Sequence, residues 1–113
     1  MFKIYSEIID LCKKFKPDVV AVEKLFFAAN SKTAITVGQA RGAILVAAGS
    51  AGLPVSSFTP LEVKQDITGY GRASKEQMQQ MVMRTLHLKT VPQPDDTADA
   101  LAVAITYCFM KKY

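Results

Sequence analysis

Four apolar residues and a closing carboxylate stand together in the run Val19-Val20-Ala21-Val22-Glu23. A short strand that is apolar on both faces is typical of a buried parallel sheet. A helix predicted for residues 31–48 and a strand predicted for residues 54–58 follow it, so residues 19–58 form a βαβ unit with an expected right-handed crossover. Open α/β sheets place their sites at the carboxyl ends of strands, which makes Glu23 the first candidate. The alternative is a solvated charge, or an ion pair with Lys24.

Helical patterns fill the rest of the chain. Apolar residues at helical spacing predict a helix over residues 2–15. Capping boxes at Thr59–Glu62 and Ser74–Gln77 predict the starts of two further helices, and an apolar pattern predicts a last helix over residues 95–110. The order α-β-α-β-α-α-α predicts a single α/β domain over residues 1–113. Two strands are few for an open sheet, as in the back half of an α/β domain.

Composition narrows the classes of protein. The chain is 50% hydrophobic with a net charge of +4, which fits a globular domain and is compatible with a polyanionic partner. Cys12 and Cys108 form no Cys-x-x-Cys pair and His87 is the single histidine, which argues against a disulfide scaffold, a zinc site or a Ser–His dyad. A reducing cytoplasm is the expected location. The longest apolar stretch, residues 43–48, is much shorter than the roughly 18 residues of a membrane span.

Two aspartates near the start of the last helix are the second candidate feature. Asp96 and Asp99 are three residues apart and share one helix face. The alternative is that they complement the helix dipole, with Asp95 as the N-cap. Asp99 lies between two alanines on an apolar helix, which predicts a buried carboxylate in need of a partner such as a metal ion. Oxygen ligands without nitrogen or sulfur favour Mg²⁺, with Mn²⁺ as a substitute, and such ions assist phosphodiester cleavage.

Basic and aromatic side chains complement the acidic residues. Lys64 lies on the helix after the second strand, and Arg72 and Lys75 belong to a glycine-containing loop that enters a helix N-terminus, where phosphate can bind. Phe26, in the loop after Glu23, is a candidate for stacking on bases. The alternatives are solvated cations and a core aromatic residue.

Small residues recur at steps of four on the predicted helix over residues 31–48. These are Ala34, Gly38 and Gly42. Such a face permits the close approach of another backbone, either the chain's own sheet or a second subunit.

Taken in order, these segments resemble the RuvC family of Holliday-junction resolvases. The segments that carry the resemblance are Ala21 to Asn30, Gly38 to Gly42, Val63 to Gln65, Gly69 to Gly71, and Asp96 to Ala102. The resemblance implies an RNase H-like fold without its first three strands. It also implies a Mg²⁺-dependent crossover junction endodeoxyribonuclease of DNA recombination and repair, which nicks four-way junctions symmetrically as a homodimer. A branch-migration motor complex is a further partner of interest.

The resemblance also implies roles for individual residues. Glu23, Asp96 and Asp99 match the second, third and fourth of four catalytic, metal-binding carboxylates. Phe26, Lys64 and Lys75 match DNA-contacting residues, and the face of Ala34, Gly38 and Gly42 is placed at the dimer contact. The family's first carboxylate belongs to a Gly-Ile-Asp-Pro-Gly type motif that has no counterpart here. We therefore expect this chain by itself to bind metal weakly and to cleave slowly or not at all.

Two other functions are compatible with the same residues. One is a non-catalytic fragment that binds DNA junctions through Phe26, Lys64, Arg72 and Lys75. The other is an RNase H-like nuclease that acts on RNA.

Overall fold

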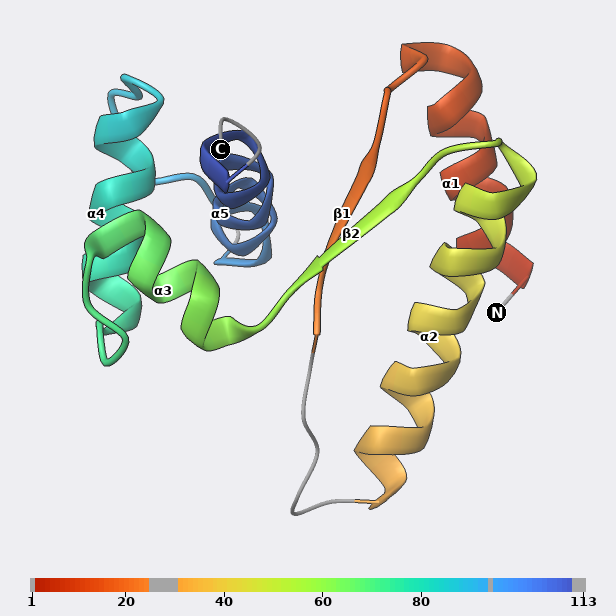
Figure 1. The fold of residues 1–113 in the computed structure, drawn as a ribbon, viewed down its shortest axis with the longest axis horizontal. Helices are drawn as coiled ribbons and strands as arrows, with labels where there is room; N and C mark the ends of the chain where they lie inside the picture. Colours follow the sequence, from red (N-terminus) through yellow and green to blue (C-terminus); the bar gives the residue numbers. More distant parts are fainter. Residues whose placement is uncertain (1, 25–30, 94, 111–113) are drawn as a thin grey trace. The chain divides into compact units, whose positions relative to one another are not determined.

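The computed structural model describes residues 2–24, 31–93 and 95–110, and its elements follow the predicted order (Figure 1). The elements are α1 (Phe2–Phe15), β1 (Val20–Glu23), α2 (Ser31–Ser50), β2 (Val55–Phe58), α3 (Pro60–Thr68), α4 (Lys75–Thr85) and α5 (Asp95–Met110). The chain divides into two compact units. The first contains α1 and α2, and the second contains α3, α4, α5 and the carboxyl ends of both strands. None of the helices described is long and apolar enough to cross a membrane.

The two strands pair in parallel, as predicted. The Val20 N–H donates to the Pro54 carbonyl at 3.0 Å, and four residues further along the Lys24 N–H donates to the Phe58 carbonyl at 2.6 Å. The expectation that β1 is buried on both faces is wrong, because all four of its residues are partly exposed. Within the described part of the chain β1 has β2 as its one neighbour in the sheet, so less of its surface is covered than in a wider sheet.

The first unit is built on the packing of α1 against α2. The amphipathic pattern of α1 provides the apolar side, and Ala47 and Ala48 of α2 are fully buried. At one end of the pair the Tyr5 hydroxyl donates to the Ser50 hydroxyl oxygen at 3.3 Å. Two large apolar side chains of α1, Leu11 and Phe15, remain exposed.

The second unit has a core shared by β2, α3, α4 and α5. Its buried members are Phe58, Val63, Ile67, Val82, Ala102, Val103 and Ile105. Met78 and Met81 of α4 pack against this core. Leu86, the residue just past the end of α4, is 38% exposed.

Local capping determines where α3 and α4 begin. The Glu62 N–H donates to the Thr59 hydroxyl oxygen, and the Thr59 N–H donates to the Glu62 carboxylate. Ser74 and Gln77 make the same reciprocal pair at the start of α4. Gly69 ends α3 with a φ of 78°, a left-handed conformation that glycine adopts without a Cβ clash. These caps determine where α3 and α4 begin and end, and so where Lys64 lies on α3 and Lys75 on α4.

Candidate active site

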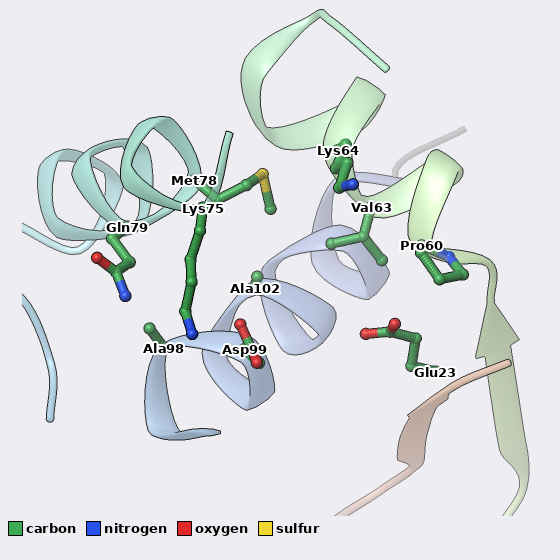
Figure 2. A pocket seen from close by; sticks show the side chains of 10 residues that line it. All are labelled: Glu23, Pro60, Val63, Lys64, Lys75, Met78, Gln79, Ala98, Asp99 and Ala102. Atoms are coloured by element: carbon green, nitrogen blue, oxygen red, sulfur yellow. The ribbon is translucent and has the colours of Figure 1, made fainter. Parts of the chain in front are cut away.

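A cavity of about 260 Å³ opens in the second unit, between the end of β1 and the three helices α3, α4 and α5 (Figure 2). Its charged and amide-bearing lining residues are Glu23, Lys64, Lys75, Gln79 and Asp99. Its apolar wall comes from Pro60, Val63, Met78, Ala98 and Ala102. Several of these apolar residues belong to the core or pack on it, so a rigid surface supports the polar groups.

Two of the three predicted carboxylates meet in this cavity. Glu23 is the last residue of β1, where a parallel strand delivers its side chain to the carboxyl edge of the sheet. Asp99 lies on α5, one turn from the helix start. Figure 2 shows both carboxylates facing the space between β1 and α5. Asp96 belongs to the first turn of α5, and its side chain lies outside the description.

The expectation that Asp99 is buried is wrong. Ala98 and Ala102 face the core at 3% exposure, whereas Asp99 and Ala100 are exposed. Successive helical residues point about 100° apart, so Asp99 lies at the border of the buried face and reaches the cavity. Flanking alanines fit either side of a helix and therefore do not reveal burial.

The electrostatics of the cavity suit a cation. Burial raises the pKa of Glu23 above its usual value of 4.5, the negative charge of Asp99 raises it further, and the charge of Lys64 opposes both. A partly buried carboxylate whose ionisation is disfavoured beside a second carboxylate, as that of Glu23 is, is stabilised by a hard cation with oxygen ligands. Among the side chains described, no group of three His, Cys, Asp or Glu residues comes together as a complete metal site.

The predicted basic residues divide into two sets. Lys64 and Lys75 line the cavity from α3 and α4, and Figure 2 shows Lys75 extending toward the beginning of α5. Arg72 is exposed in the loop between α3 and α4 and is not among the lining residues. Phe26 lies outside the described residues. The cavity thus holds cations from two helices opposite two carboxylates.

The predicted small-residue face lies on α2, in the first unit. A Cβ built on Gly38 or on Gly42 would meet nothing within 4 Å inside the chain. Neither glycine is therefore required by packing against the chain's own described residues. Ala34 belongs to the same helix, and its side chain lies outside the description.

Sequence reasoning missed Gln79. This half-buried residue lines the cavity together with Lys75, which precedes it by four residues on α4. The spacing of four was a usable signal, because it places the two side chains on one helix face.

Comparisons with known proteins agree with one another. Residues 1–107 match the family model described as crossover junction endodeoxyribonuclease RuvC. The protein of that name from Syntrophomonas wolfei is 53% identical over 113 residues, all of this chain and 64% of the relative. The one from Moorella thermoacetica is 58% identical over 104 residues, 92% of this chain and 62% of the relative. The chain thus spans a little under two thirds of the length of these relatives.

Solved structures match as well. The structure of Thermus thermophilus RuvC superposes with a TM-score of 0.90 at 43% identity, covering 97% of this chain and 66% of that one. A structure of T. thermophilus RuvC in complex with a Holliday junction substrate gives a TM-score of 0.91 at 43% identity, covering 96% of this chain and 66% of that one. The α/β architecture predicted from the sequence is therefore the one found in these structures.

Proposed function

Because the chain belongs to the RuvC family of crossover junction endodeoxyribonucleases, which share an RNase H-like fold, we propose that it serves as the metal-dependent part of a structure-selective endonuclease. Its substrate is a four-way DNA junction, and its reaction is hydrolysis of phosphodiester bonds to give symmetric nicks. The relative that has been solved with a Holliday junction supports this substrate.

One observation carries the proposal. The cavity of the second unit is lined by two carboxylate side chains, Glu23 and Asp99, and by two ammonium-bearing side chains, Lys64 and Lys75. Carboxylates alone would repel the phosphates of DNA, and lysines alone would bind them without chemistry. The combination matches what metal-assisted phosphodiester cleavage requires, namely a cation site next to a phosphate site.

Each residue then has a distinct task. Glu23 and Asp99, together with Asp96, would hold Mg²⁺ or Mn²⁺ through oxygen atoms. When bound, the cation supplies Lewis acidity toward the scissile phosphate and toward the attacking water. Lys64 and Lys75 bind and orient the phosphate and offset the negative charge that develops on it. Arg72 contacts DNA beyond the cavity, and Phe26 is assigned to DNA contact as well.

Symmetric nicking needs two sites, which requires a homodimer. We assign the contact to the face of α2 that carries Ala34, Gly38 and Gly42, because it presents little side chain. An isologous contact of this kind places the same patch of both subunits together.

Cleavage of a synthetic four-way junction tests the proposal. We expect the unchanged chain to bind the junction in preference to a linear duplex of the same sequence and to nick it only slowly in Mg²⁺. Glu23→Gln and Asp99→Asn should each lower the nicking rate by about 100-fold or more, since a lost metal contact removes several kcal/mol of transition-state stabilisation. Both variants should keep junction binding in EDTA, measured by gel shift.

The same assay separates the alternatives. Nicking that survives in both variants would refute the assigned site. Tight junction binding by the unchanged chain without nicking would favour a binding role instead. Faster cleavage of an RNA–DNA hybrid than of the junction would point to a nuclease that acts on RNA.

A further inference from the structure

Gln79 occupies a place in the cavity that packing alone does not explain. It lines the cavity with Glu23 and Asp99, it is half-buried, and it follows Lys75 by one helical turn. The preceding residue, Met78, already supplies an apolar contact with the core. A side-chain amide that is partly removed from water needs hydrogen-bond partners, so its polarity has to serve a purpose.

The beginning of α5 borders the same cavity through Ala98 and Asp99. Figure 2 shows Lys75 and Gln79 leaving α4 on the side where Ala98 and Asp99 of α5 lie. The first N–H groups of any helix have no acceptor within the helix. A glutamine amide can accept from such groups with its oxygen and donate to carboxylates with its nitrogen. A lysine at the same place could only donate to carboxylates, because its ammonium group accepts no hydrogen bond.

The turn at the beginning of α5 also has a strict geometric demand if it holds metal ligands. It carries Asp96 and Asp99, and a metal site tolerates displacements of its ligands of only about 0.5 Å. The buried face of α5 holds the helix through Ala98 and Ala102, and Asp99 lies at the border of that face. Gln79 faces that border from α4.

We propose that Gln79 is a positioning residue that braces the N-terminal turn of α5 against α4, and so holds Asp99 in place for the cation. The proposal rests on the function proposed above, since it assigns the braced residue to a metal site. Gln79 acts through its amide on α5, and it neither binds the cation nor contacts DNA.

Substituting Gln79→Met tests this role, because methionine has nearly the same length and helix propensity but no amide. Gln80→Met is the matched control, since Gln80 is exposed and adjacent on the same helix. The first measurement is hydrogen exchange, without metal, of peptides covering residues 95–101. We expect about fivefold faster exchange there in the Gln79 variant, the order expected for the loss of one hydrogen bond, and no change in the control.

The second measurement is the affinity for Mn²⁺, followed by the electron paramagnetic resonance of the free ion. Loss of a group that orients metal ligands typically weakens binding by about 10- to 100-fold, and we expect a change in this range for the Gln79 variant alone. Junction binding in EDTA should stay unchanged, including its dependence on salt. By contrast, Lys75→Met should reduce the slope of log affinity against log salt by about one.

Three outcomes would overturn the proposal. The first is unchanged exchange over residues 95–101 in the Gln79 variant, and the second is Mn²⁺ affinity within twofold of the unchanged chain. The third is a loss of metal-free junction binding comparable to that of Lys75→Met, which would make Gln79 a DNA contact. If the unchanged chain binds neither Mn²⁺ nor junctions, the proposed function fails, and the exchange experiment still decides whether Gln79 braces α5.

Discussion

At the scale of single residues, Glu23 is under opposing demands. A metal site needs its carboxylate ionised, while burial and the charge of Asp99 raise its pKa and so disfavour that form. Lys64 relieves the conflict in part. Side chains whose pKa is shifted by burial and by neighbouring charges are common at functional sites. Folding stability alone does not favour such a shift.

This conflict predicts how stability depends on pH when no metal is present. Since the pKa of Glu23 is higher in the folded state than its usual 4.5, its favourable contribution is complete below that value and is lost as pH rises through the folded pKa. Glu23→Gln should therefore raise the free energy of unfolding at pH 7 relative to the unchanged chain, and by less at pH 4. Urea denaturation in EDTA at both values measures this difference.

Glu7→Gln, which removes an exposed carboxylate from α1, is the control for the change in net charge. The prediction fails if Glu23→Gln destabilises the chain at pH 7, or if its effect is equal at the two pH values. The first result would mean that the carboxylate is held by favourable partners rather than penalised by the cavity.

At the scale of elements, the loop between α3 and α4 determines how the two cavity lysines are presented. α3 ends at Gly69, whose N–H donates to the Gln65 carbonyl at 2.8 Å and whose φ is 78°. The hydroxyl of Thr68 adds local support by donating to the Lys64 carbonyl at 2.7 Å. The direction that the chain takes after α3, the helix that carries Lys64, therefore depends on the left-handed conformation of Gly69.

Gly69→Ala should destabilise the chain by about 1–2 kcal/mol, because a Cβ is strained in the left-handed region. Thermal or urea unfolding measures the change. Gly49→Ala is the control, since Gly49 lies in α2 and a Cβ there meets nothing within 4 Å. It should be neutral or stabilising by about 0.5–1 kcal/mol, as alanine suits a helix better than glycine. Equal effects at both positions would contradict the argument.

Helix starts and strand pairing show which parts of the fold could be predicted from the sequence and which could not. The capping boxes at Thr59 and Ser74 were predictable because the hydrogen bonds involved join residues three apart, within one turn. The parallel pairing of residues 20–23 with 55–58 was predictable from their apolar character and the helix between them. The partial exposure of β1 was not, because burial depends on which elements cover a strand.

The candidate site shows the same division. Glu23, Lys64, Lys75 and Asp99 were chosen from the chain itself, and the structure brings them to one cavity. The exposure of Asp99 was mispredicted, since alanine neighbours are compatible with either side of a helix. Gln79 was missed because a glutamine on a helix surface is ordinary until the packing of α4 against α5 gives it a neighbour.

At the scale of the whole molecule, the two units carry different parts of the proposed function. The cavity lies entirely in the second unit, while the small-residue face lies on α2 in the first. Catalysis and self-association can therefore be perturbed separately by substitution. A variant that alters one and spares the other tests the division directly.

Gly38→Glu should weaken self-association by about tenfold or more, equivalent to about 1.4 kcal/mol, because it sets two like charges and two larger side chains into an isologous contact. Sedimentation equilibrium measures the change. The fold of the single chain should tolerate the substitution, since a Cβ at Gly38 meets nothing within 4 Å. Gln39→Glu, an exposed neighbour about 100° around α2, introduces the same charge as a control. If both variants dissociate equally, charge repulsion at a distance explains the effect. If neither does, the contact between subunits lies on another face, and the glycines of α2 need a different explanation.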